Sequence, residues 1–163
     1  MPNNAHLLAQ LQVLVDFPGI DGCALVETAT GMAWHVAGNF PEVERISEAA
    51  IEFWRVQHRL SEHLTALGAI QSVAYSFSNR VVALFPCCED PGLVLVAIAA
   101  KGPVAWPAWG VKVGAFRLAV ANLLESGKGL NKSPNLMASQ SGWSKVLERV
   151  VNQCDLNFTQ TLF

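Results

Sequence analysis

The sequence predicts an α+β domain with the element order helix, two strands, helix, three strands, helix (αββαβββα), followed by a C-terminal appendage. Three observations lead to this prediction. Apolar residues recur every three or four positions from Pro41 to Leu67, as in an amphipathic helix. Val81–Phe85 and Leu93–Ala100 are wholly apolar, which fits strands at the centre of a sheet. From Ser126 to Gln140 the composition shifts to Gly, Ser, Asn, Lys and Pro, which is typical of a linker.

The composition favours a single domain that associates with other chains. Of the 163 residues, 52% are hydrophobic and 15% are charged, so there is more apolar material than a small monomer usually hides. The net charge of -2 argues against binding to nucleic acid. The longest apolar run, Leu93–Ala100, falls well short of the roughly 20 residues that a membrane helix requires. Met1–Asn4 lacks the features of a signal peptide, so we expect a cytoplasmic protein without membrane insertion.

The first third of the chain predicts a helix followed by a β-hairpin. Ala5–Phe17 places its leucines on one side of a short helix, which Pro18-Gly19 ends. Ile20–Glu27 and Met32–Ala37 are rich in β-forming residues, and Thr28–Gly31 supplies the turn between them.

The longest predicted element is a helix over Pro41–Leu67 with two stripes at helical spacing. We expect the first stripe, which is mostly apolar, to pack on the helix's own domain. The second stripe has mixed polarity with an aromatic residue in its middle, which suits contact with another chain. The first stripe comprises Val43, Ile46, Ala50, Phe53, Gln57, Leu60, Leu64 and Leu67, and the second comprises Ser47, Ile51, Trp54, His58, Ser61 and Thr65.

Three strands are predicted after Gly68, which stops the long helix. They cover Ile70–Phe77, Val81–Phe85 and Leu93–Ala100, and Pro86–Gly92 is expected to be a loop. The continuous apolar character of the last two strands predicts that both of their faces are buried.

The last helix of the domain is predicted over Val111–Glu125, after a linker over Lys101–Gly110. Its polar residues Lys112, Arg117 and Asn122 scatter around the helix, so no side of it is clearly suited to solvent. We therefore expect this helix to be covered on more than one side.

The segment Phe17–Glu27, with its turn glycine Gly31, resembles the roadblock (dynein light chain) family. The family pattern opens with a helix, a Pro-Gly-hydrophobic-x-Gly-small turn into the first strand, and a hairpin that contains glycine. Pro18-Gly19-Ile20-Asp21-Gly22-Cys23 matches this turn, and it falls at the right place in the string of elements. The resemblance covers about residues 5 to 125. We therefore divide the chain into a roadblock-like domain, 1–126, and a linker with a C-terminal extension, 127–163.

The resemblance implies a roadblock/profilin-like fold: a five-stranded antiparallel sheet with the long helix on one face and the flanking helices on the other. Family members pair with a second copy through the long helix and the middle strand, here Pro41–Leu67 and Ile70–Phe77. Many are non-enzymatic scaffolds or regulators of small Ras-like GTPases. The resemblance thus implies a non-enzymatic, homodimeric protein-interaction module that serves either as a scaffold or as a regulator of such a GTPase.

Trp106 and Trp109 lie in a segment flanked by prolines, and two interpretations stay open. They can anchor a partner, as exposed aromatic residues often do, or they can fold back over the end of the sheet. The predicted dimer or partner interface comprises Ser47, Ile51, Trp54, His58, Ser61, Thr65, Ser72, Ala74, Ser76, Trp106 and Trp109.

Enzymatic chemistry finds little support in the sequence. His58 and Glu62 stand one helical turn apart, as a base and its orienting carboxylate do, but no nucleophile is placed near them. The histidines lack metal-binding spacings, and we predict no catalytic residue, metal or cofactor. The cysteines show no CxxC spacing and are expected to be reduced, with Cys87-Cys88 buried at a strand end.

Two further alternatives remain. The chain can be a small-ligand sensor, which requires a cavity between sheet and helices lined by residues such as Trp34, Phe77 and Phe85. In the extension, Ser141–Val151 predicts a short helix whose Trp143 either packs on the domain or binds a partner.

Overall fold

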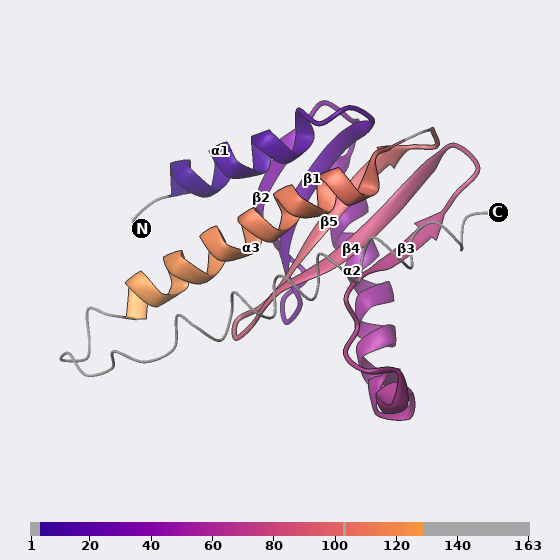
Figure 1. The fold of residues 1–163 in the computed structure, drawn as a ribbon, viewed down its shortest axis with the longest axis vertical. Coiled ribbons are helices and arrows are strands. Elements are labelled where there is room, and N and C mark those ends of the chain that lie inside the picture. The colour runs from indigo at the N-terminus through magenta and orange to yellow at the C-terminus, as the bar shows by residue number, and fades with distance from the viewer. Residues whose placement is uncertain (1–3, 103, 129–163) are drawn as a thin grey trace.

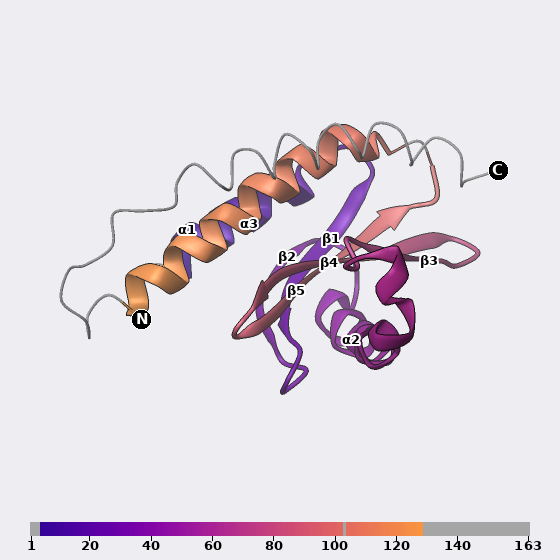
Figure 2. The same cartoon turned by 60° about the horizontal axis from the view of Figure 1, so that its bottom comes forward.

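In the computed structural model, which describes residues 4–102 and 104–128, a five-stranded antiparallel sheet lies between α2 on one face and α1 and α3 on the other (Figures 1 and 2). The strand order is β2-β1-β5-β4-β3. The predicted α+β class and the five-stranded sheet are thereby confirmed. The elements are α1 (Asn4–Val15), β1 (Ile20–Glu27), β2 (Ala33–Gly38), α2 (Val43–Leu60), the 3-10 helix η1 (Ser61–Leu67), β3 (Val73–Ser76), β4 (Arg80–Glu89), β5 (Gly92–Ala100) and α3 (Trp106–Lys128).

The sheet separates two hydrophobic cores. Alternate residues of β1 point to opposite faces, so Cys23 and Leu25 join the core under α1 and α3 while Ala24 and Val26 join the core under α2. β5 is central in the sheet, and its residues from Leu93 to Ala99 are buried on both faces. This explains why its sequence is continuously apolar.

Two glycines allow β1, β2 and the start of α2 to approach one another. Gly38 has a φ of 109°, and a Cβ atom built on it would lie 2.5 Å from the backbone oxygen of Asp21. A Cβ atom on Gly22 would lie 2.6 Å from Cγ2 of Val43. Because these contacts are too short for real atoms, both positions require glycine. The second glycine of the Pro-Gly-x-x-Gly turn is therefore a packing requirement of this fold.

The predicted loop Pro86–Gly92 is wrong, because β4 continues to Glu89. On one side Pro86 pairs in register with Val94 of β5. On its other side β3 pairs only with residues 81–84 of β4, so Pro86 lies beyond the end of that neighbour. A residue that lacks a backbone N–H is tolerated at such an edge position. A register shift between Pro86 and Cys88 accompanies it.

Several predicted boundaries also change. The long helix is α-helical only to Leu60 and continues as the 3-10 helix η1. α3 begins at Trp106, so the second half of the predicted linker Lys101–Gly110 is helical; Pro107 fits there because the first helical turn needs no backbone N–H partner. α3 ends at Lys128 and includes the first residues of the predicted linker Ser126–Gln140. The remainder of that linker and the predicted helix Ser141–Val151 lie outside the described residues.

Within the described part of the chain, no helix combines the length and the apolar character needed to cross a bilayer.

Candidate protein-interaction surface

The part of α2 up to Trp54 lies against the sheet, and the part beyond Trp54 does not. The residues of α2 that are buried end at Trp54. Beyond it, α2 and η1 extend past the edge of the sheet, below it in Figure 1. Side chains in this part have no sheet to cover them. The buried residues of α2 are Val43, Ser47, Ala50, Ile51 and Trp54.

A row of exposed apolar side chains begins at Phe53, beside the sheet, follows the projecting part of α2 and continues along η1. We call it the α2 row. The fractional exposure of its members ranges from 37% for Leu64 to 82% for Leu67, with Leu60 at 46%. Large apolar side chains in a continuous exposed row are typical of protein–protein contact sites. The α2 row comprises Phe53, Val56, Leu60, Leu64 and Leu67.

The α2 row is continuous with the β3 edge of the sheet. The ring centroids of Phe53 and Tyr75, a residue of β3, are 4.7 Å apart. A shallow groove of about 140 Å³ lies beside this pair and is lined by Ile46, Phe53 and the exposed Phe77, among others. The helix row and the end of the β3–β4 hairpin thus form one surface, which we call the α2–β3 surface.

Within residues 4–102 and 104–128, β3 is an edge strand that pairs with β4 on one side only. No described strand pairs with the backbone groups on its other side, and an edge of this kind is a common route to sheet extension between proteins. The exposed side chains of β3 are the small ones of Ala74 and Ser76.

Arg55 fixes the orientation of α2 on the sheet. Its Nε donates a hydrogen bond of 2.8 Å to the carbonyl oxygen of Thr28, and its Nη2 donates one of 3.0 Å to that of Ala29. Both oxygens lie in the turn between β1 and β2. These two hydrogen bonds hold α2 to the hairpin turn at the point where the helix leaves the sheet. The guanidinium also pairs with Glu52, which lies three residues earlier in α2.

The predicted roles of the two α2 stripes are partly exchanged. Ser47, Ile51 and Trp54, expected at the interface, are buried against the chain's own sheet and are not accessible to a partner. Phe53, Leu60 and Leu64, expected in the core, are exposed. The small side chains at Ser47 and Ala50 allow close approach to the sheet, and this selects the inward face.

The other residues predicted for the interface stay accessible: His58, Thr65, Ala74 and Ser76 are exposed, and Ser61 and Ser72 are half-buried.

The two tryptophans before the last helix fold back onto the domain. Trp109 is fully buried, and its Nε1 donates a 3.0 Å hydrogen bond to the backbone oxygen of Leu14. Its ring packs edge-on against Phe85 at 5.3 Å and against the half-buried Trp106 at 5.7 Å. Trp109 therefore belongs to the core under α1 and α3, and the prediction that it anchors a partner is wrong.

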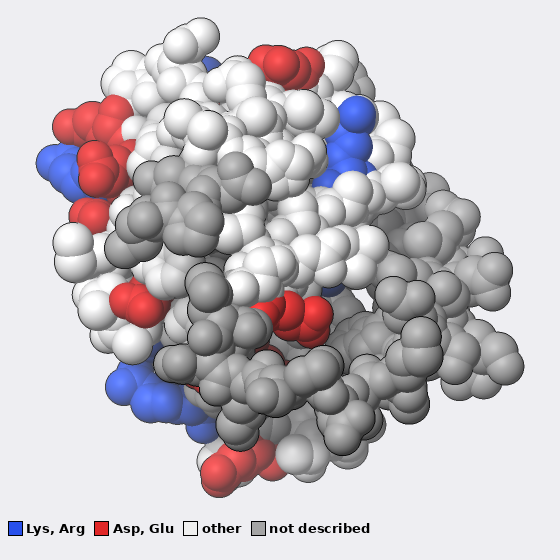
Figure 3. Space-filling view, turned by 90° about the vertical axis from the view of Figure 1, so that its left-hand side faces the viewer, with Lys and Arg blue, Asp and Glu red and all other residues white. Residues whose placement is uncertain are grey.

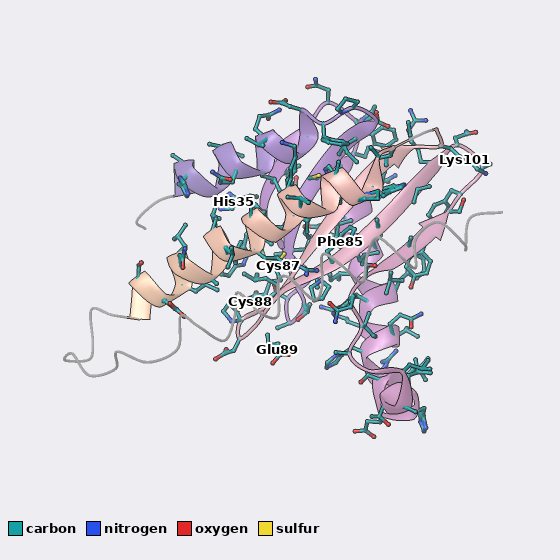
Figure 4. The ribbon with its side chains drawn as sticks, in the orientation of Figure 1. His35, Phe85, Cys87, Cys88, Glu89 and Lys101 are labelled. Atoms are coloured by element: carbon teal, nitrogen blue, oxygen red, sulfur yellow. The ribbon has the colours of Figure 1, made fainter. Side chains whose placement is uncertain are left out.

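The thiols of Cys87 and Cys23, on the opposite face of the sheet, are poorly suited to act as nucleophiles. Phe85, Cys87 and Cys88 follow one another along β4 beside α3 (Figure 4). Burial raises the pKa of the Cys87 thiol to about 11, and the charge of Arg117 opposes this shift only in part. Burial also raises the pKa of Cys23. Thiols that hold their protons are weak nucleophiles and weak metal ligands. Among residues 4–102 and 104–128, no group of three His, Cys, Asp or Glu side chains is arranged to hold a metal ion.

The residues expected to line a ligand cavity are not brought together. Phe85 packs on Trp109 under α3, whereas Phe77 is exposed at the α2 face of the sheet. Trp34 is exposed on β2, at the far edge of the sheet from β3.

Charged side chains form no extended patch of one sign on the side of the molecule shown in Figure 3. Acidic and basic residues are interspersed around a broad uncharged area. Long-range electrostatic attraction to a strongly charged partner therefore has little basis on this side.

The sheet lies between two helical layers and leaves the α2–β3 surface exposed, which defines a small α+β domain. No family model matches the sequence, and no curated protein matches it. Solved structures do match. A Roadblock/LC7 domain from Streptomyces avermitilis has a TM-score of 0.61 at 14% identity, covering 74% of this chain and 96% of that one. Myxococcus xanthus MglB has a TM-score of 0.64 at 12% identity, with 76% and 98% covered. An MglB structure described as having a tetrameric arrangement has a TM-score of 0.60 at 12% identity, with 75% and 90% covered. The chain has the roadblock fold.

Proposed function

We propose that this protein is a non-enzymatic interaction module that pairs with a second copy through the α2–β3 surface and, as a dimer, regulates a small Ras-like GTPase. The observation that carries the proposal is the α2 row, which projects beyond the sheet and leaves large apolar side chains uncovered. The proposed interface contains the α2 row together with His58, Ser61, Thr65, Ser72, Ala74 and Ser76.

Pairing of two copies about a two-fold axis would cover both parts of this surface, namely the edge of β3 and the α2 row. The free edge of β3 can pair with the same edge of a second copy and so extend the sheet. The α2 row then lies beside the same row of the partner, which removes Leu60 and Leu64 from water. An interface that uses the same patch on both copies closes on itself and produces a dimer.

Regulation of a GTPase is the part of the proposal that rests on the family resemblance. A dimer of this type would act by geometry: its paired helices would hold a switch region of the GTPase, while the nucleotide and the hydrolysis chemistry belong to the partner. Burial raises the pKa of the Cys87 thiol, which makes this group a weak nucleophile.

The test uses a GTPase captured on the purified full-length protein. Leu60→Glu places a charge in the α2 row, and Leu8→Glu is a matched control because both leucines are 46% exposed. We expect the wild type and Leu8→Glu to capture a Ras-like GTPase and to change its rate of GTP hydrolysis, and Leu60→Glu to do neither. Absence of any Ras-like GTPase from the captured proteins, or an unchanged hydrolysis rate with the wild type, would overturn the regulatory role.

A further inference from the structure

A second uncovered apolar surface lies on the helical layer opposite α2. Val111, Ala115 and Leu118 are spaced four and three residues apart, so they share the outer side of α3. Val111 is 61% exposed and Leu118 is 46% exposed. The sequence predicts that this helix is covered on more than one side, yet within the described residues only its inner side is packed.

A groove between α1 and α3 borders this row of side chains. It has a volume of about 390 Å³ and is open to solvent. His6 and Gln10 of α1 form one wall, and Ala115, Ala119 and Leu123 lie on the other. The groove reaches Ser126, close to Lys128, where α3 ends.

The chain that follows Lys128 is long enough to return along this groove. Residues 129–140 can span up to roughly 40 Å when extended, and α3, with 23 residues, is about 35 Å long. Residues 141–151 can therefore reach any point on the outer side of α3. Because the two parts belong to one chain, the effective concentration of the segment at the groove is high.

The sequence of residues 141–151 matches the chemistry of the groove. Trp143, Val146, Leu147 and Val150 recur at helical spacing and would form one apolar side, with Lys145, Glu148 and Arg149 on the other. We propose that this segment docks as an amphipathic helix along the groove between α1 and α3 and covers Val111 and Leu118. This surface lies across the sheet from the α2–β3 surface, so the proposal does not depend on dimerisation.

Limited proteolysis of the full-length chain tests the docking. Trypsin cleaves after Lys145 and Arg149, and a docked segment is cut only when it opens. Leu118→Glu places a charge on the proposed surface. The control is Leu8→Glu, since Leu8 has the same 46% exposure but is about 200° around α1 from His6, away from the groove. We expect Leu118→Glu to speed cleavage after Arg149 by about tenfold or more and Leu8→Glu to leave it unchanged.

A substitution on the segment completes the test. Trp143→Glu should speed cleavage as Leu118→Glu does, and the double variant should be cut no faster than either single variant, because both remove the same contact. Unchanged melting temperatures would show that the domain stays folded. Equal cleavage rates in the wild type and Leu118→Glu would overturn the proposal. Protection that is lost on dilution would also overturn it, because the groove would then be occupied by a second copy.

Discussion

The indole Nε1 of Trp109 donates a hydrogen bond to the backbone carbonyl of Leu14, 95 residues earlier in the chain. Leu14 lies in the last turn of α1, where a carbonyl has no partner within its own helix. The bond therefore completes the end of α1 and joins the first helix of the domain to the last one. It ties the two helices that cover one face of the sheet.

Trp109→Phe should destabilise the domain by about 2 to 4 kcal/mol, because it leaves the buried Leu14 carbonyl unpaired and opens space beside Phe85. Urea unfolding measures the free energy. Trp106→Phe is the control, since Trp106 is only half-buried and the substitution keeps an aromatic ring beside Trp109. We expect the control to cost less than about 1 kcal/mol. Equal losses in the two variants would show that the hydrogen bond contributes little.

Ser47→Ala should stabilise the protein by about 1 kcal/mol. Ser47 lies on the inner side of α2 and is fully buried, and its hydroxyl has no hydrogen-bond partner among the described residues. Removing an unpaired buried hydroxyl lowers the cost of desolvation, and alanine also favours helix. Ala50→Ser, the reverse change one turn later at a position that is 3% exposed, should destabilise by about 1 to 3 kcal/mol. Loss of stability in Ser47→Ala, measured by urea unfolding, would contradict this account of the α2 core.

Gly38→Ala should lower the free energy of unfolding by at least about 2 kcal/mol. The backbone has a positive φ at this position, and the new Cβ atom would collide with the backbone oxygen of Asp21. The control is Gly110→Ala in α3, where the added Cβ would meet no atom within 4 Å apart from the neighbouring residues and the helix's own backbone. That substitution should stabilise the helix by about 0.5 to 1 kcal/mol. Thermal unfolding of the two variants should therefore shift in opposite directions, and a shift of Gly38→Ala upward would rule out the close contact between β1 and β2.

The stability should fall in alkaline solution through Cys87. Its pKa is raised by burial from 9.0 to about 11, so the folded state keeps a proton that the unfolded chain has lost. The contribution of this thiol is fully present below pH 9 and is lost as the pH rises through about 11. Urea unfolding at pH 8 and pH 11 should show a loss on the order of 2 kcal/mol that is smaller in Cys87→Ala. An identical pH dependence in the variant would exclude Cys87 as the source.

The sequence predicted the element order and the central strands well, because both follow from local periodicity. β5 is continuously apolar, which requires cover on both faces, and the Pro-Gly-x-x-Gly turn contains a glycine whose Cβ atom would collide with Val43. The start of α3 was also within reach, since a proline such as Pro107 is favourable in the first turn of a helix.

Local periodicity could not predict which side of α2 faces the sheet. Both stripes have helical spacing, and the choice depends on how far the sheet extends beneath the helix. Ser47 and Ile51 are buried against the sheet, whereas Leu60 is 46% exposed. Arg55 fixes this placement through the carbonyls of Thr28 and Ala29, which are contacts across some 26 residues of sequence. The spacing of residues in the sequence therefore could not predict which stripe is exposed, because that depends on the three-dimensional structure.

Sedimentation equilibrium of the full-length protein tests most directly whether the α2–β3 surface joins two copies. We predict a mass twice that of one chain for the wild type and for Leu8→Glu, and the mass of a single chain for Leu60→Glu, because a charge in the α2 row would be buried without a partner. A wild type that sediments as a single chain at micromolar concentration, or a Leu60→Glu variant that remains paired, would contradict the account.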